Sequence, residues 1–190
     1  MKKIGLIGED PNDTTSVAKL LEKKYKGQVQ FVALAKRIRG YQLNNDKIKK
    51  ILPIEFASQK CKLVIFIRDL DAFKSQGVKV TAVNNWFKAV NSTINNQGIL
   101  LNNIWELEAL IFADIETFNL IYNISHKFKG DPTMIKEPKE KLMELTSGTR
   151  KQYRESHCPE IFEKLSIDTV EKNCAYFREF ITAFDEKIKK

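Results

Sequence analysis

The sequence predicts an α/β fold in which a mostly parallel sheet is flanked by helices and followed by a C-terminal helical cap. The first indication is a set of short apolar runs rich in branched residues, at residues 4–8, 63–67 and 99–104. Runs of this kind are typical of strands that are buried on both faces of a parallel sheet. The second indication is their alternation with amphipathic helical patterns, which favours right-handed crossovers between parallel strands.

The first part of the chain is expected to run strand, helix, strand, helix, strand. The turn that follows the first strand offers Asn12 or Asp13 as a helix N-cap, and Pro53 is expected to break or cap the second helix. After the strand at 4–8, the expected elements are a helix at 14–25, a strand at 29–34, a helix at 45–59 and a strand at 62–67.

The pattern changes near Tyr122. Before it, the sequence predicts a helix at 80–94, a strand at 99–104 and a helix at 106–122. After it, a polar stretch containing Gly and Pro precedes helices at 160–165 and 167–188. The chain is therefore expected to form an α/β core over 1–122 and a helical cap over 123–190, both within one compact unit.

Composition narrows the classes of partner. The 190 residues are 43% hydrophobic, enough for a core, and carry a net charge of +8 with a pI of about 9.3. This balance favours polyanionic partners, above all nucleic acid. Cys61, Cys158 and Cys174 have neither metal-ligand nor disulfide spacing, and no segment has the pattern of a signal peptide or a membrane span. We therefore expect a cytoplasmic protein without membrane partners.

Acidic residues follow three of the predicted strands. Glu9 and Asp13 come after the first, Asp69 and Asp71 after the third, and Glu106 and Glu108 after the fourth. Because ligands bind off the carboxyl ends of parallel strands, these acids are expected to converge at one edge of the sheet. Converging carboxylates repel one another, and hard oxygen ligands suit Mg²⁺ or Mn²⁺.

This arrangement is suited to phosphoryl transfer. Carboxylate-bound Mg²⁺ can neutralise a phosphate, generate a nucleophile from water and stabilise the leaving oxygen. We expect Glu9, Asp69 and Asp71 to be catalytic, with Glu9 as a metal ligand or as a general acid or base. The expected metal ligands are Glu9, Asp13, Asp69, Asp71 and Glu106.

The spacing of Glu9 and Asp13, followed by the Asp69-Leu70-Asp71 motif, resembles the Toprim fold of topoisomerases, bacterial primases and overcoming-lysogenisation-defect nucleases. Gly40 lies near the glycine that commonly follows the second strand of that fold. Asp10 stands where the primase form has glycine, and Lys74 stands where a further glycine is usual. The resemblance implies a Toprim-like parallel sheet and a metal-dependent nuclease.

A closer resemblance covers nearly the whole chain. Small stand-alone Toprim-like proteins, often encoded in bacterial defence islands, share the order of features seen here: a Glu-Leu-Glu segment at 106–108, a Pro-Lys step at 138–139, a basic-Tyr-basic segment at 150–154 and a Cys-x-x-Phe helix at 174–177. The resemblance implies the nuclease effector of an anti-phage defence system that works with an ATPase partner. The alternative is a non-catalytic subunit that binds nucleic acid or an ATPase.

Each candidate residue also has a structural explanation. Asp13 is as well explained by a role as a helix cap as by metal binding. Because residues two apart do not share a helix face, only one of Glu106 and Glu108 is expected to join the metal site, with a slight preference for Glu106. Basic residues are candidates for gripping substrate phosphates, or they form a solvated face: Arg150, Lys151, Arg154, Arg37 and Arg39.

Two other enzyme classes rank lower. In haloacid-dehalogenase-like phosphatases the Asp-x-Asp motif ends the first strand, whereas Asp69 follows the third. A receiver domain would need a later Thr and Lys on successive strands, and no clear pair is present. There is also no Gly-rich phosphate loop, so any ATP hydrolysis must come from a partner.

Overall fold

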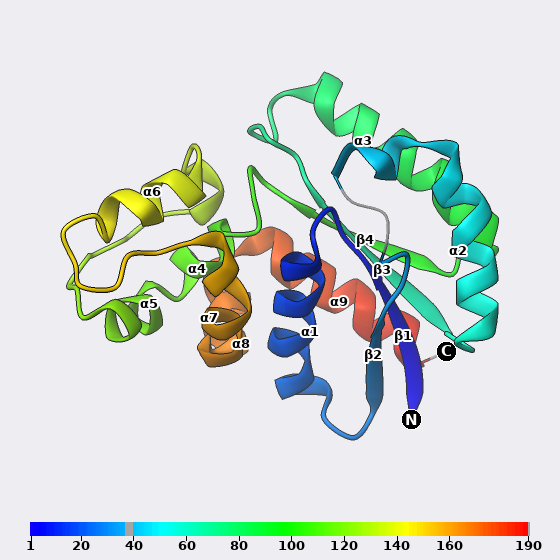
Figure 1. The fold of residues 1–190 in the computed structure, drawn as a ribbon, viewed down its shortest axis with the longest axis horizontal. Helices are drawn as coiled ribbons and strands as arrows, with labels where there is room; N and C mark the ends of the chain where they lie inside the picture. The colour runs from blue at the N-terminus through cyan, green and yellow to red at the C-terminus, as the bar shows by residue number, and fades with distance from the viewer. Residues whose placement is uncertain (37–39, 190) are drawn as a thin grey trace.

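A four-stranded, all-parallel sheet forms the centre of the protein, with the strands in the spatial order β2-β1-β3-β4 (Figure 1). This computed structural model describes residues 1–36 and 40–189, so Arg37 and Arg39 lie outside the described residues. The strands are β1 (Lys2–Ile7), β2 (Val29–Ala33), β3 (Leu63–Asp69) and β4 (Gly98–Asn103). The predicted α/β fold with a parallel sheet is confirmed.

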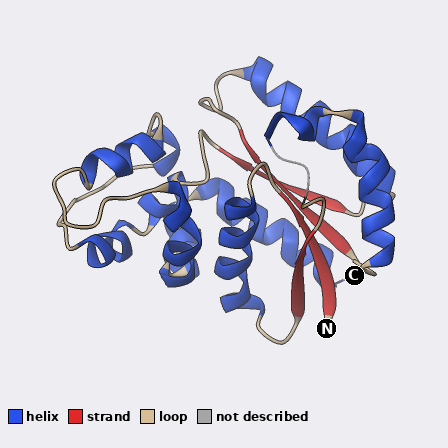
Figure 2. Cartoon of the chain, in the orientation of Figure 1, coloured by secondary structure: helices blue, strands red, loops and turns tan. Residues whose placement is uncertain are grey.

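Helices cover both faces of the sheet (Figure 2). On one face lie α1 (Pro11–Tyr25) and α9 (Ala175–Lys189), and on the other lie α2 (Asp46–Ser58) and α3 (Gly77–Asn91). Alternate side chains of each strand feed the two cores. On β3, for example, Ile65 packs towards α1 and Phe66 packs towards α3.

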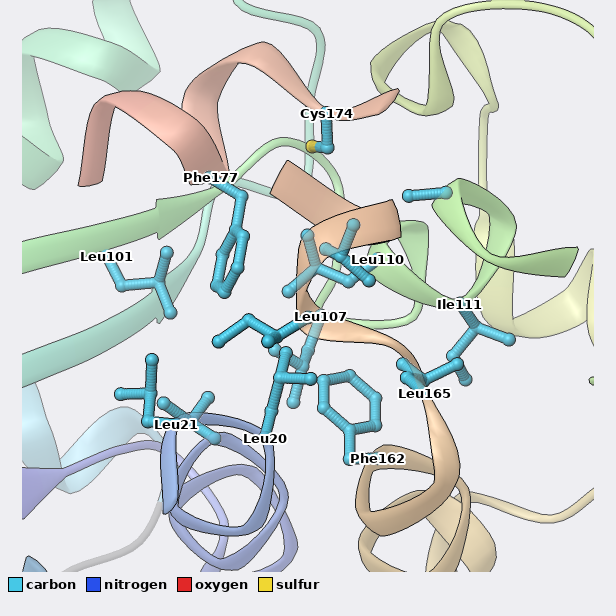
Figure 3. Close-up of a cluster of buried hydrophobic side chains, with 14 of the residues drawn as sticks. Leu20, Leu21, Leu101, Leu107, Leu110, Ile111, Phe162, Leu165, Cys174 and Phe177 are labelled. Atoms are coloured by element: carbon cyan, nitrogen blue, oxygen red, sulfur yellow. The ribbon is translucent and has the colours of Figure 1, made fainter. Parts of the chain in front are cut away.

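The remaining helices form a lobe beside α1. They are α4 (Ala109–Ala113), α5 (Ile115–Tyr122), α6 (Pro138–Leu145), α7 (Cys158–Lys164) and α8 (Ile167–Asn173), with short 3₁₀ turns at Pro132–Met134 and Glu155–His157. Two further 3₁₀ turns, Gly40–Asn44 (η1) and Ser92–Ile94, lie outside the lobe and pack near α2 and α3. One apolar core runs without a break from the sheet into this lobe. Figure 3 shows Leu20 of α1, Phe162 of α7 and Phe177 of α9 packed around Leu107.

Two long predicted helices are interrupted. The predicted helix at 106–122 breaks at Asp114, whose buried carboxylate accepts hydrogen bonds from the Ser166 backbone N–H at 2.7 Å and from Thr117 at 2.8 Å. The predicted helix at 167–188 breaks at Cys174, which has extended backbone angles (φ −128°, ψ 105°). The contact between Asp114 and Ser166, which is distant along the chain, overrides the local helical pattern at the first break.

The second break sends α9 back to the sheet. Phe184 of α9 packs edge-on against Tyr25 of α1, with ring centres 5.0 Å apart, and stacks on Phe31 of β2. The segment expected as a cap is therefore divided: residues up to Asn173 belong to the lobe, and α9 completes a layer of the α/β core.

Pro53 was expected to interrupt the second helix, and this prediction was wrong, because α2 continues through it. The carbonyl that loses its hydrogen bond belongs to Lys49, one turn earlier, and Lys49 is exposed, so water can replace the lost donor. Within the described chain, no helix has the length and apolarity needed to cross a bilayer.

Candidate functional site

The loops after β1, β3 and β4 meet at the carboxyl edge of the sheet. The register pairs Asp69, the last residue of β3, with Asn103, the last residue of β4, so these two strands end level. Ile7, the last residue of β1, pairs with Phe66, so β1 ends three residues earlier and Glu9 follows it at the same edge of the sheet. The chain crosses from β1 outward to β2, and then returns to place β3 on the other side of β1. Such a reversal opens the crevice in which open α/β sheets bind ligands.

The first loop is built around the start of α1. Asp10 caps the helix, because its carboxylate accepts from the Asn12 backbone N–H at 2.8 Å, and Asp13 accepts in return from the Asp10 N–H at 3.0 Å. This is a capping box, with Pro11 at the first helical position. The residue that departs from the primase pattern, Asp10, thus has a structural role, and so does Asp13.

Asp13 nevertheless faces other acids. Its carboxyl has a pKa raised to about 7, first because it is buried and then because of the nearby charges of Glu108, Asp10 and Glu9. An ordinary cap on a protein surface has no such neighbours. Asp13 therefore caps the start of α1 and is also a candidate metal ligand.

Asp69 is the last residue of β3. Its carboxylate accepts a hydrogen bond of 2.8 Å from the side-chain amide of Asn103, which is fully buried at the end of β4. Burial raises the pKa of Asp69 well above its usual range, and the charges of Asp13, Glu108 and Glu9 raise it further. Asp69 therefore lies at the centre of a group of mutually repelling acids.

Asp71 lies in the turn that leaves β3. Its φ of 50° is left-handed, a conformation that Asp tolerates better than most residues. The turn is fixed by backbone hydrogen bonds from Asp71 N–H to the Trp105 carbonyl (3.0 Å) and from Trp105 N–H to the Ala72 carbonyl (3.2 Å). The Asp71 side chain is exposed, and its charge raises the pKa of Glu9.

Glu9 follows β1 and contacts a cation. The Arg68 Nε lies 2.9 Å from Glu9 Oε1 in an ion pair, although the N–H does not point along the hydrogen-bond direction. Burial raises the pKa of Glu9, while the Arg68 charge and the Asp69 backbone N–H lower it. The Glu9 carbonyl also accepts from the Gly40 N–H at 2.8 Å, which ties the loop after β2 to the same edge.

The two glutamates after β4 have different surroundings. Glu108 is buried, accepts a 2.9 Å hydrogen bond from the Tyr153 hydroxyl, and shares charge repulsion with Asp13 and Asp69. Glu106 instead faces the lobe: it accepts from the Lys139 backbone N–H at 3.2 Å and lies 3.5 Å from the Lys139 ammonium. The slight preference for Glu106 is therefore reversed, because Glu106 is occupied in joining the lobe to the core.

Five carboxylates thus share one edge of the sheet, and we call them the acid cluster: Glu9, Asp13, Asp69, Asp71 and Glu108. Within residues 1–36 and 40–189, no three carboxylate, imidazole or thiol side chains converge closely enough to hold a metal ion in the arrangement shown. The donor set still fits Mg²⁺ or Mn²⁺, because it consists of carboxylate oxygens, and burial raises the pKa values of Glu9, Asp13, Asp69 and Glu108.

The predicted basic segment lies in the lobe. Arg150 and Arg154 are exposed, whereas the Lys151 ammonium lies 3.5 Å from Glu160 and 5.5 Å from the centre of the Tyr122 ring. Tyr153, in the same segment, is the residue that reaches Glu108. The segment is therefore anchored to the acid cluster through Tyr153.

Sequence reasoning did not single out three residues that hold the acids in place: Asn103, Tyr153 and Arg68. The sequence does carry a feature that could have identified two of them. Asn103 is a polar residue ending an apolar strand, and Tyr153 is an aromatic residue within a basic segment. Arg68 directly precedes the Asp69-x-Asp71 motif, but nothing in the sequence pairs it with Glu9.

Comparison with known proteins identifies a family. No curated protein and no solved structure gives a significant match to this chain. Residues 9–185 match the family described as "Domain of unknown function (DUF4276)", and this span includes the whole acid cluster and the whole lobe. The chain therefore belongs to the DUF4276 family.

Proposed function

We propose that this protein is a Mg²⁺-dependent, Toprim-type nuclease that hydrolyses phosphodiester bonds in DNA or RNA. The observation that carries the proposal is the acid cluster, in which carboxylates from three strand-end loops lie near enough for their charges to raise the pKa values of Glu9, Asp13 and Asp69. Such an arrangement is unfavourable without a cation, and clustered acids with perturbed pKa values are typical of functional sites.

The residues of the acid cluster and their hydrogen-bond partners have different proposed roles. Glu9, Asp69 and Asp71 would hold Mg²⁺ or Mn²⁺, with Asp13 and Glu108 extending the ligand set. The bound metal supplies charge neutralisation of the phosphate and a water of lowered pKa. Glu9, half-buried in the loop after β1, can accept a proton from the attacking water. Asn103 and Tyr153 orient Asp69 and Glu108 through single hydrogen bonds.

The substrate class follows from charge. A net charge of +8 favours a polyanion, and Arg150, Lys151 and Arg154 are proposed to contact its backbone, with Arg37 and Arg39 as further candidates. The role as the effector of an anti-phage system, working in the cytoplasm with an ATPase partner, rests on the resemblance to defence-island Toprim-like proteins.

Cleavage assays test the proposal. Labelled single- and double-stranded DNA and RNA are incubated with the protein in Mg²⁺, in Mn²⁺ and in EDTA, and we expect metal-dependent cleavage of at least one substrate. The double variant Asp69→Asn/Asp71→Asn should lose about 10³-fold or more of this activity while keeping its fold. The matched control is Glu22→Gln, which neutralises an exposed acid on α1.

Two outcomes would contradict the nuclease. One is cleavage that persists in the double variant, which would mean that other residues or a contaminant carry the activity. The other is nucleic-acid binding with neither cleavage nor a Mg²⁺-dependent rise in melting temperature, which would instead support the non-catalytic subunit.

A further inference from the structure

Arg68 is a cation placed at the border of the acid cluster. It lies on β3 directly before Asp69, and its side chain is only 12% exposed. Because neighbouring residues of a strand point to opposite faces, Arg68 extends towards α3 while Asp69 extends towards β4 and α1. Arg68 therefore borders the site on the side opposite to the lobe.

The guanidinium is held by contacts other than its ion pair. Its central carbon lies 4.6 Å from the centre of the Trp86 ring, and Nη1 donates to the Asn44 side-chain carbonyl at 3.3 Å. Trp86 is itself fixed, because its indole N–H donates to the Leu43 carbonyl at 2.8 Å and its ring packs edge-on against Phe66. The stack orients the guanidinium plane before any ligand binds.

The guanidinium also has N–H groups to spare. Arginine carries five N–H donors. In the described part of the chain, Nη1 donates to Asn44, and Nε approaches Glu9 without hydrogen-bond alignment. The Nη2 amino group has no partner among these residues. An ordinary internal counter-ion would be expected to align its donors with the carboxylate that it neutralises.

We propose that Arg68 is a catalytic residue that binds a non-bridging oxygen of the substrate phosphate. The inference rests on the proposed nuclease function and deepens it, by naming the protein group that meets the phosphate on the α3 side. A cation held by the acid cluster competes with Arg68 for Glu9, which leaves the stacked guanidinium free to form the paired hydrogen bonds that phosphates favour. Substrate then passes over the sheet edge between the lobe and α3.

A second cation lies on the same side. Lys79 of α3 is exposed, and its ammonium donates to the Asp71 carbonyl at 2.6 Å, which places it beside the turn that leaves β3. The α3 side of the site thus offers Arg68 for the reacting phosphate and Lys79 for a neighbouring one. The lobe is not the only basic surface next to the acids.

Two substitutions separate charge from geometry. Arg68→Lys keeps the charge and removes the planar fork, so kcat/KM for cleavage should fall about 10²-fold while the salt dependence of oligonucleotide binding stays the same. Arg68→Gln removes the charge, so binding of a labelled oligonucleotide in Ca²⁺ should weaken, and the slope of log K against log[salt] should fall by about 0.7–0.9. Arg178→Ala, at an exposed arginine of α9 that donates to the backbone carbonyls of Glu171 and Lys172, is the control.

Metal affinity distinguishes this role from a purely structural one. Removing a cation beside Glu9 should leave the Mg²⁺-dependent thermal shift unchanged or move its midpoint to lower Mg²⁺. If Arg68 only positions Glu9, the midpoint moves to higher Mg²⁺ in both variants, and oligonucleotide binding and its salt slope do not change. A midpoint at higher Mg²⁺ in both variants overturns the inference, and so does unchanged oligonucleotide binding with an unchanged salt slope in Arg68→Gln. If Arg68→Gln does not fold, Arg68→Lys carries the test alone.

The two proposals fail in different ways. Wild-type protein that cleaves nucleic acid, with Arg68→Lys cleaving equally well, contradicts the role of Arg68 and leaves the nuclease intact. Wild-type protein that cleaves none of the substrates in Mg²⁺ or Mn²⁺ contradicts the nuclease itself.

Discussion

The acid cluster and the basic segment of the lobe both concentrate charge of one sign, but their charges are balanced differently. In the basic segment, Lys151 lies near Glu160 and over an aromatic ring, and Arg150 and Arg154 are exposed to water. In the acid cluster, within the described residues, Glu9 alone has a cationic side chain against its carboxylate. A charge that is paired or exposed to water is stable without a ligand. A partly buried charge without a partner lowers the stability of the fold, so the acid cluster is expected to bind a ligand.

The largest expected effect separates the two glutamates after β4. Glu108→Gln keeps an oxygen that can accept from Tyr153 but removes a charge from the acid cluster, so the Mg²⁺ concentration that gives half-maximal thermal shift should rise on the order of 100-fold. Glu106→Gln should leave that concentration unchanged and lower the free energy of unfolding by about 1 kcal/mol, because it weakens the contact with Lys139. If Glu108→Gln and Glu106→Gln changed Mg²⁺ binding equally, the different surroundings of the two glutamates would not determine which of them binds the metal.

The second effect concerns pH. The pKa of Asp13 is raised from 3.8 to about 7 in the folded protein, so between these pH values the folded state binds more protons than the unfolded state. The free energy of unfolding therefore falls as pH rises from about 4 to about 7, and this group contributes on the order of 3 kcal/mol. Urea denaturation at several pH values in EDTA measures the slope.

Asp13→Asn serves as the reference for this slope, because its side-chain oxygen can still complete the capping box. Burial lowers the pKa of His157, so the folded protein binds fewer protons at this residue than the unfolded chain, and its contribution to the free energy of unfolding rises with pH. Subtracting the Asp13→Asn curve from the wild-type curve removes this opposing contribution. We expect Mg²⁺ to flatten the wild-type curve. Identical curves for wild type and Asp13→Asn would show that Asp13 acts only as a cap.

A smaller effect is expected where the two regions meet. Tyr153→Phe removes the hydroxyl that donates to Glu108 and contacts the Cys158 sulfur at 3.0 Å, leaving a buried carboxylate without this donor. Metal affinity should fall about 10-fold, and the unfolding free energy in EDTA should fall by about 1–2 kcal/mol. Phe118→Leu, next to Tyr153 in the same core, is a control that perturbs packing alone. A loss of stability in Tyr153→Phe with unchanged Mg²⁺ affinity would limit Tyr153 to a packing role.

The smallest effect is expected in the basic segment itself. Replacing Arg150, Lys151 and Arg154 with Ala should weaken nucleic-acid binding a few-fold and flatten its salt dependence, because fewer counter-ions are released, while metal binding stays the same. Lys151 is expected to contribute least, since Glu160 already balances it. An unchanged salt slope would assign these residues to a solvated face and transfer the role to Arg37, Arg39 and the α3 side.

The parts of the fold that follow from local pattern could be predicted. The apolar runs correspond to β1, β3 and β4, and the acids after them lie at one edge because the carboxyl ends of parallel strands meet at the same edge of the sheet. The break at Asp114 could not be predicted, because it depends on a contact with Ser166, far away along the chain. The break at Cys174 returns α9 to the sheet, where Phe184 packs against Tyr25 and Phe31.

By itself, the sequence determined the strand pattern, the parallel direction of the strands and the supply of carboxylates at the strand ends, since each depends on the spacing of apolar and acidic residues over a few positions. The tertiary structure alone decided which neighbours each acid has. Tyr153 reaches Glu108 across 45 residues of sequence, and Arg68 meets Glu9 across the gap between two strands. Such pairings depend on how the lobe and the sheet pack together, and no local periodicity records them.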